Sequence, residues 1–187
     1  MFYLIFVIVS ALLIILYNAM SVGFSLGSLL DATISVAIGA AAIFIVDAIL
    51  ALAIRRLTPQ CLYKPECILF RVSKREKKLY TKLKIKKWKD VVPELGVFTG
   101  FSKSEIKSTN DPKYLHRFLI ESNYGVVIHL ANAIFGFVIL FIPLCSRPSI
   151  WVPIFIVNFI LSMLPVFILR HTTHTLFRLY KKSQRKK

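Results

Sequence analysis

The chain has 187 residues, of which 56% are hydrophobic, and its formal net charge at neutral pH is +16. Ordinary soluble domains are about 45–50% apolar, so the excess argues against that class. The sequence also shows no groove-reading motif and no metal-ligand cluster such as H-E-x-x-H, so we expect neither a nucleic-acid partner nor a bound metal.

Charged residues are absent or sparse in four long apolar runs, at about residues 2–22, 32–54, 124–144 and 150–169. A run of about 18 or more apolar residues can span the hydrocarbon core of a bilayer as a helix. The first run has no basic leader and no clear cleavage site, so we interpret it as a retained helix. The sequence therefore predicts an all-α polytopic membrane protein with four transmembrane helices.

Basic residues are distributed very unevenly along the chain. Of the 25 Lys and Arg residues, 17 lie between Arg55 and Tyr124, and seven lie from Arg170 onward. The positive-inside rule places both basic segments in the cytoplasm. With four spans, both termini are then cytoplasmic and the loops around 23–31 and 145–149 lie outside. We expect a multi-pass cell-membrane protein whose basic segments meet anionic lipid headgroups.

The predicted organisation has four parts. They are transmembrane helices 1 and 2 (1–54), a basic cytoplasmic or interfacial segment (55–123), transmembrane helices 3 and 4 (124–169) and a basic cytoplasmic tail (170–187).

Two helices are predicted in or near the basic segment. The stretch "RVSKREKKLYTKLKIKKWKD", Arg71 to Asp90, fits an amphipathic helix lying along the membrane interface, with Trp88 as an aromatic anchor. The alternative is a solvated basic face with Trp88 in a small core. Further on, Asp111 suits an N-cap and Pro112 suits the first helical position. No breaker follows before Gly125, so this second helix should continue into the third span.

Polar residues lie within the predicted spans at similar depths. Counted from the cytoplasmic ends, Asp47, His129 and Ser162 each lie about 10 Å into a span. Asn132 lies one helical turn beyond His129, and Asn158 lies one turn beyond Ser162. An ionisable group at such depth is costly unless it has a partner or a wet cavity, so Asp47 and His129 form a plausible pair.

Two interpretations of this polar layer remain open. Polar side chains can bond across helices and fix the bundle, at about 0.6–2 kcal/mol each. Alternatively, they can line a cleft that is open to the cytoplasm, where a lipid headgroup reacts. Glu121 lies about 12 Å along the same helix from His129, too far to orient its imidazole. It is suited to binding a headgroup or to pairing with a nearby Lys or Arg.

Three stretches stand out for their specific motifs: "KIKKWKDVVPELGVFTGFSK" (Lys84–Lys103), "YLHRFLIESNYGVVIHL" (Tyr114–Leu130), and "LPVFILR" with the later "LFRLY" (Leu164–Tyr180). They resemble the glycosyl-4,4'-diaponeurosporenoate acyltransferase family of small bacterial membrane proteins. The resemblance covers roughly residues 45–180. It implies transfer of a fatty acyl group onto a glycosylated carotenoid, in the last step of staphyloxanthin synthesis.

The resemblance also matches individual positions and shows two departures. The matching residues are Trp88, Lys89, Asp90, Pro93, Glu94, Gly96, Glu121, Tyr124, Gly125 and His129. Val126 stands where an acidic residue commonly follows Tyr-Gly in the family. Arg170 is followed by "HTTHTLFR" rather than the usual Arg-Tyr-Asn-Arg-x-Arg.

The resulting hypothesis is an acyltransferase that acts on a hydroxyl of an amphiphilic glycolipid acceptor at the cytoplasmic face. His129 is the expected base, because imidazole titrates near neutrality, with Asp47 or Glu121 in tuning or positioning roles. His116, His171 and His174 are rival bases. Substrate contacts are expected from Trp88, Lys89, Asp90, Glu94, Tyr124, Asn132 and Arg170.

No cofactor is expected beyond the acyl donor, which is an acyl-CoA or acyl carrier protein thioester. Lys86, Lys87 and Lys89 would attract its phosphates. The alternative, from another class, is a non-enzymatic lipid-binding or transport component, or a partner subunit of a membrane complex.

Overall fold

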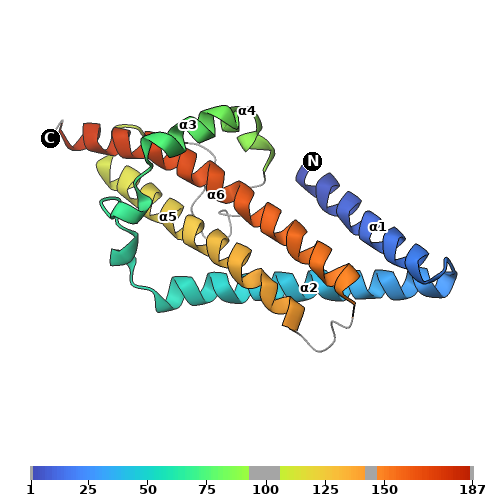
Figure 1. The fold of residues 1–187 in the computed structure, drawn as a ribbon. Coiled ribbons are helices and arrows are strands. Elements are labelled where there is room, and N and C mark those ends of the chain that lie inside the picture. Colours follow the sequence, from blue (N-terminus) through green and yellow to red (C-terminus); the bar gives the residue numbers. More distant parts are fainter. Residues whose placement is uncertain (1, 93–105, 142–146, 186–187) are drawn as a thin grey trace. The chain divides into compact units, whose positions relative to one another are not determined.

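The structure is a computed structural model that describes residues 2–92, 106–141 and 147–185 (Figure 1). Four of its helices are long and apolar enough to cross a membrane, so the predicted all-α chain with four such helices is confirmed. The chain divides into two compact units. The first contains Met1–Leu52 and Leu130–Met163, and the second contains Ala53–His129 and Leu164–Lys187. Three long helices contribute residues to both units.

The first two helices are joined by a much shorter loop than the predicted 23–31. Helix α1 (Phe2–Val22) is followed by Gly23 at a φ of 102°, a conformation that costs glycine little. Helix α2 (Leu26–Leu57) then begins, because the Ser25 hydroxyl accepts a hydrogen bond from the Ser28 backbone N–H at 3.1 Å. The prediction of a longer loop is therefore wrong.

Helix α5 (Pro112–Phe135) confirms the predicted continuous helix that leads into the third span. Its start is capped as expected, since the Asp111 carboxylate accepts a hydrogen bond from the Lys113 backbone N–H at 2.8 Å. After Phe135 the chain tightens into the 3-10 helix η5 (Gly136–Phe141). The end of the predicted run, to residue 144, lies outside the described residues.

Helix α6 (Pro148–Gln184) is much longer than the predicted span of 150–169. The sequence predicts that residues 170–187 form a basic tail after this span, but α6 continues through most of that segment. Leu176 and Tyr180, spaced i, i+4, pack with three buried side chains of α5: Leu115, Phe118 and Leu119. This packing explains why the helix persists beyond the apolar run.

The basic segment between α2 and α5 forms several short helices, and the predicted single helix over 71–90 is wrong. The elements are η1 (Gln60–Tyr63), η2 (Ile68–Phe70), α3 (Lys74–Lys82), α4 (Ile85–Trp88) and η3 (Lys89–Val91). The break between α3 and α4 occurs at Lys84, whose φ is 52°. Helix α3 begins with a capping box formed by Ser73 and Glu76. Tyr80 and Ile85 are the buried residues of these two helices, whereas Leu79 and Leu83 are exposed.

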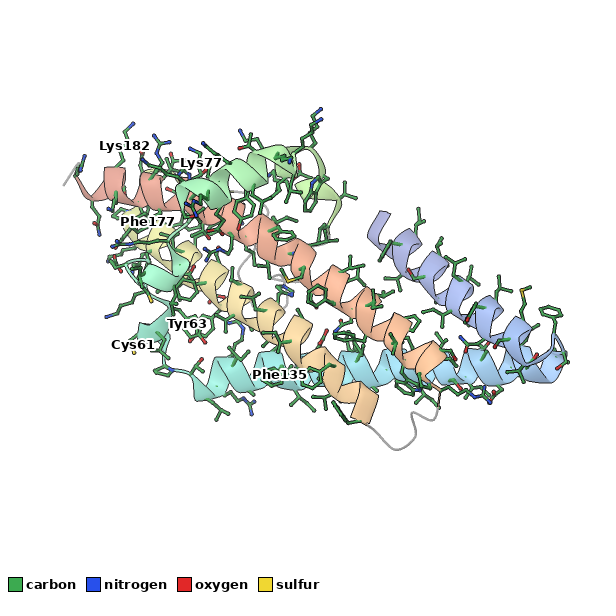
Figure 2. The ribbon with its side chains drawn as sticks, in the orientation of Figure 1. Cys61, Tyr63, Lys77, Phe135, Phe177 and Lys182 are labelled. Carbon is green, nitrogen blue, oxygen red and sulfur yellow. The ribbon has the colours of Figure 1, made fainter. Side chains whose placement is uncertain are left out.

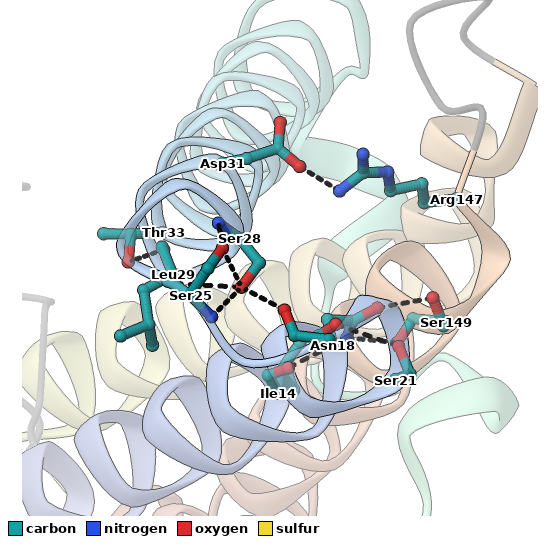
Figure 3. Close-up of polar contacts among 11 residues, drawn as sticks. Ile14, Asn18, Ser21, Ser25, Ser28, Leu29, Asp31, Thr33, Arg147 and Ser149 are labelled. Atoms are coloured by element: carbon teal, nitrogen blue, oxygen red, sulfur yellow. Dashed lines mark hydrogen bonds and ion pairs between the residues drawn. The ribbon is translucent and has the colours of Figure 1, made fainter.

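The first unit has an apolar core formed by side chains of α1, α2 and α6: Ile14, Val36, Ile43, Ile150, Trp151 and Ile154. Two polar contacts accompany this core. The Ser149 hydroxyl donates to Asn18 Oδ1 at 2.5 Å, and Arg147 forms an ion pair with Asp31 (Figure 3). Both join an apolar helix to the start of α6.

Gly39 allows α2 and α6 to pack closely in the first unit. A Cβ at this position would lie 2.6 Å from Ile154 Cδ1 and 3.3 Å from the Trp151 ring. Gly27, on the same helix, has a single neighbour near its Cβ position, at 3.8 Å. Small residues at helix contacts permit such an approach in membrane proteins.

We predict that Gly39→Leu lowers the free energy of unfolding by about 1–3 kcal/mol, because the added side chain overpacks the contact with α6. The same change at Gly27, where there is room, should leave it unchanged or slightly higher through helix propensity. Thermal unfolding of both variants in detergent micelles, followed by circular dichroism, measures the difference. Equal unfolding midpoints would contradict the packing role of Gly39.

Candidate functional site

Glu121 of α5 is paired with Arg55, the first basic residue after the apolar part of α2. Arg55 Nη2 lies 2.9 Å from Glu121 Oε2, and the two side chains are 29% and 16% exposed. Of the two roles expected for Glu121, pairing with a nearby base is the one observed. A charged hydrogen bond at this distance and degree of burial holds the end of α2 against α5.

Two stacked tyrosine rings pack next to this ion pair. The rings of Tyr63 and Tyr124 are 3.7 Å apart between centroids and 18° from parallel, and the Arg55 guanidinium lies 5.5 Å from the Tyr124 centroid. The Tyr124 hydroxyl donates to the Thr58 carbonyl at 3.3 Å. The Tyr63 hydroxyl and Thr58 Oγ1 are 2.7 Å apart. Arg55 is therefore fixed both by a carboxylate and by an aromatic face.

Asn123 is a member of this cluster that sequence reasoning missed. Its side chain is buried and donates from Nδ2 to the Tyr63 carbonyl at 3.0 Å, which ties η1 to α5. The adjacent Ser122 is fully buried. The sequence offered a signal, because "ESNYG" places three consecutive polar residues directly after the apolar "FLI".

Arg170, predicted to bind substrate, is engaged within the protein. Its Nε lies 2.5 Å from Glu76 Oε1 and its Nη2 lies 2.9 Å from Glu76 Oε2, a bidentate pair. Its Nη1 also donates to the Leu69 carbonyl at 3.0 Å. Tyr80 donates a further hydrogen bond to the same carboxylate. These contacts hold α3 and the end of η2 against α6.

The environment of Glu76 favours its charged form. Burial acts to raise the pKa of Glu76, but hydrogen bonds from Arg170 and Tyr80 outweigh it and hold the pKa below the ordinary value of 4.5. Burial, followed by the bond to Glu76, raises the pKa of Tyr80, so the phenol remains protonated and donating. Sequence reasoning missed Glu76, although the capping pattern Ser73-x-x-Glu76 pointed to it.

The Glu76–Arg170 pair, called the clamp below, is followed along α6 by two of the rival histidines, His171 and His174. The rings of His171 and Tyr80 meet edge to face at 6.3 Å between centroids, and Lys86 and Lys89 act electrostatically on the His171 imidazole. Lys77 and Arg178 act in the same way on His174. Both imidazoles are half-buried. This is a basic surface that suits an anionic ligand.

The other predicted substrate contacts are distributed around α4 and η3. The half-buried Trp88 donates from Nε1 to the Leu83 carbonyl at 3.0 Å. Lys89 Nζ lies 3.2 Å from Asp90 Oδ1, and the Asp90 side chain is 78% exposed. Glu94 lies outside the described residues.

The predicted polar layer is distributed over both units. Asp47, Asn132, Asn158 and Ser162 belong to the first unit, and within it the Asn158 side chain hydrogen-bonds to the Asp47 carboxyl. His129 is half-buried on α5 and is the last residue of that helix in the second unit. The pairing of Asp47 with His129 stays a prediction. Within the described ranges, no three His, Cys, Asp or Glu residues gather as they would to hold a metal ion.

We predict that Glu76→Gln lowers the free energy of unfolding at pH 7 by about 1–3 kcal/mol, because Arg170 loses a charged partner. The folded-state pKa of Glu76 lies below its unfolded value, so the clamp stabilises the protein above about pH 4.5 and this stability is lost as the pH falls further. Unfolding midpoints measured from pH 7 down to about pH 3 should therefore converge for the wild type and the variant.

The control is Glu66→Gln, at an exposed carboxylate of the same segment, which should follow the wild type at every pH. A gap between wild type and Glu76→Gln that stays constant with pH would show that the charge of Glu76 is not what holds Arg170.

A family model described as glycosyl-4,4'-diaponeurosporenoate acyltransferase matches residues 61–182. The matched range contains both the Glu121 and the Arg170 clusters, apart from Arg55 and Thr58, and it does not reach Asp47. Searches of the curated proteins and of the solved structures gave no match. The family match spans well over half of the 187 residues and confirms the resemblance found in the sequence. The chain therefore belongs to the glycosyl-4,4'-diaponeurosporenoate acyltransferase family.

Proposed function

We propose that this chain is an integral membrane acyltransferase that moves a fatty acyl group onto a hydroxyl of an amphiphilic glycolipid acceptor. The acceptor class includes glycosylated carotenoids, as the family description indicates. The observation that carries the proposal is the family match, which includes Glu121, Tyr124 and His129 on one continuous helix.

The exposed apolar surface of the long helices supports placement in a membrane. Leu13 and Met20 of α1 are 63% and 68% exposed, and Phe44 of α2 is 73% exposed. Phe135, at the end of α5, also carries its ring on the surface (Figure 2). In water such surface costs about 25 cal/mol for each Å², whereas lipid chains solvate it.

The charge distribution supports an orientation with both termini and the second unit in the cytoplasm. The second unit holds nearly all the basic residues, among them Lys77 and Lys182, whose side chains extend from α3 and α6 (Figure 2). Basic residues beside spans are retained on the cytoplasmic side and interact with anionic headgroups. The acyl thioester is also a cytoplasmic metabolite in this proposal.

The chemistry assigned to His129 is general base catalysis. Its neutral imidazole takes the proton of the acceptor hydroxyl while the hydroxyl oxygen forms a bond to the thioester carbonyl carbon. The tetrahedral intermediate then collapses, the C–S bond breaks, and the imidazolium returns the proton to the leaving thiolate. The products are an ester and a free thiol, and the imidazole is regenerated.

Glu121 acts as a positioning residue in this proposal, because its carboxylate is held by Arg55 at 2.9 Å. The pair anchors α5 two turns before His129 and fixes Tyr124 at the same level. Asp47 remains the candidate for tuning the imidazole. Lys86, Lys87 and Lys89 are assigned to the phosphates of the acyl donor, since long-range attraction raises its local concentration.

We predict that His129→Ala lowers acyl incorporation about 10²- to 10⁴-fold, because the hydroxyl loses its base. The measurement is radiolabelled fatty acid recovered in extracted lipid from cells that carry each variant at equal protein level. His116→Ala is the matched control, since that imidazole packs on the Tyr180 ring and is assigned no proton transfer.

Two outcomes would redirect this proposal. Normal incorporation by His129→Ala would remove that residue from the mechanism, and a loss in His171→Ala alone would assign the base to His171. If no variant changes any acylated lipid and the wild type adds none, the chain is a non-enzymatic lipid-binding component or a partner subunit.

We also predict that changing Lys86, Lys87 and Lys89 together to Gln raises KM for the acyl thioester several-fold at low salt, with kcat little changed. The difference should shrink as the salt concentration rises, because salt screens surface charges over about 10 Å at 0.1 M. The control removes equal charge elsewhere by changing Lys113, Lys181 and Lys182 to Gln. Equal effects of the two triple variants would show that net charge, and no specific donor site, governs the rate.

A further inference from the structure

Three polar side chains from three helices meet inside the first unit. They are Asp47 of α2, Asn132 of α5 and Asn158 of α6. The Asn158 side chain interacts with the Asp47 carboxyl, and its Nδ2 donates to the Asn132 backbone carbonyl at 3.5 Å. Asn132 and Asn158 are 6% and 7% exposed. One amide thus bridges the other two helices in an apolar surrounding.

Two oxygen atoms of this cluster have no hydrogen-bond partner within the described part of the chain. They are Asp47 Oδ1 and Asn132 Oδ1, and both are shielded from solvent. A buried acceptor that has lost water and gained no donor is destabilising, and a leucine of similar size would avoid this cost. The two oxygens are therefore acceptors that lack a donor among the described residues.

The geometry of the cluster is set by packing. Gly136 lies one turn after Asn132 on the same stretch of chain, and a Cβ there would lie 2.6 Å from Asn158 Nδ2. The absence of a side chain at Gly136 leaves room for the bridging amide. The amide is thus held beside the Asp47 carboxyl, while Asp47 Oδ1 and Asn132 Oδ1 stay without a donor in the described part of the chain.

We propose that Asp47 Oδ1 and Asn132 Oδ1 accept hydrogen bonds from hydroxyl groups of a membrane-borne glycolipid, and so form a sugar-binding site in the first unit. This assignment rests on the proposed function and names where its acceptor substrate is held. Two acceptors match neighbouring hydroxyls, which donate readily. A carboxylate repels phosphate, and the apolar exterior of the unit admits an amphiphile from the lipid phase.

Asn18 provides a matched comparison within the same unit. It is 4% exposed, as buried as Asn132, but both ends of its side chain are paired. Its Nδ2 donates to the Ile14 carbonyl at 2.8 Å, and its Oδ1 accepts from the Ser149 hydroxyl (Figure 3). The two asparagines share residue type and burial, and they differ in whether the oxygen has a partner.

The experiment measures binding of radiolabelled octyl glucoside to the full-length protein in lipid nanodiscs, with thermal unfolding of the same samples. Asn132→Leu should weaken octyl glucoside binding on the order of tenfold, since one hydrogen bond to the sugar is lost. Its unfolding midpoint should be unchanged or higher, because an unpaired buried oxygen is removed. Asp47→Leu, which removes the other oxygen, should weaken binding similarly.

Asn18→Leu should give the opposite result, with a lower unfolding midpoint and unchanged binding. Labelled octyltrimethylammonium, which has the same alkyl chain but no hydroxyl, should bind the wild type and Asn132→Leu equally. Wild-type affinity of a folded Asn132→Leu or Asp47→Leu protein for octyl glucoside would overturn the site. So would an equal loss for both alkyl probes. Neither result depends on acyl transfer, so the proposed function is tested separately by the His129 variant.

Discussion

The structure depends on the need to pair polar groups inside helices whose surroundings are apolar. An unpaired group in such surroundings costs free energy that no water molecule offsets. The chain meets this need locally in several places. Asn18 bonds to α6 and to its own helix, and Arg55 is held by Glu121 and by the Tyr124 ring. Each pairing also fixes one helix against another, so satisfying the polar groups and positioning the helices are the same task.

The second unit applies the same rule to a strongly basic segment. Mutual repulsion opposes the folding of so many cations, and two of the few carboxylates join elements that are distant in sequence. Glu76 binds Arg170, 94 residues further along, and Glu121 binds Arg55, 66 residues before it. Most of the described lysines in this unit are exposed, where they are solvated and available to anions. A surface of this kind is compatible with headgroups and with a phosphorylated acyl donor.

Features that depend on local sequence were predictable. Long apolar runs identified four spans, and Asp111 with Pro112 identified the start of α5. The short first loop and the extended α6 were not anticipated, because each is decided by a contact. Ser25 caps α2, and Leu176 packs on α5. The break at Lys84 requires a positive φ at a non-glycine residue, which the sequence does not announce.

The candidate site shows the same contrast between what local sequence indicates and what tertiary contacts decide. Resemblance and residue type drew attention to Glu121, Tyr124 and Arg170, but their partners are remote in sequence and no spacing rule indicates them. Arg170 illustrates the difficulty, because a cation at the end of a span looks like a headgroup ligand until Glu76 is found beside it. The charge of a residue indicates what it can bind, whereas the fold decides whether that capacity is already used.

Asn18 and Asn132 extend this argument to residues of identical chemistry. Both are asparagines in apolar helices, and the sequence gives no reason to treat them differently. The fold pairs one fully and leaves the side-chain oxygen of the other without a partner in the described residues, as it leaves Asp47 Oδ1. A purely structural role would be met better by the first arrangement, since it stabilises without a residual cost. The second arrangement gains stability when a donor arrives, and the sugar hydroxyls of the proposed site would supply that donor.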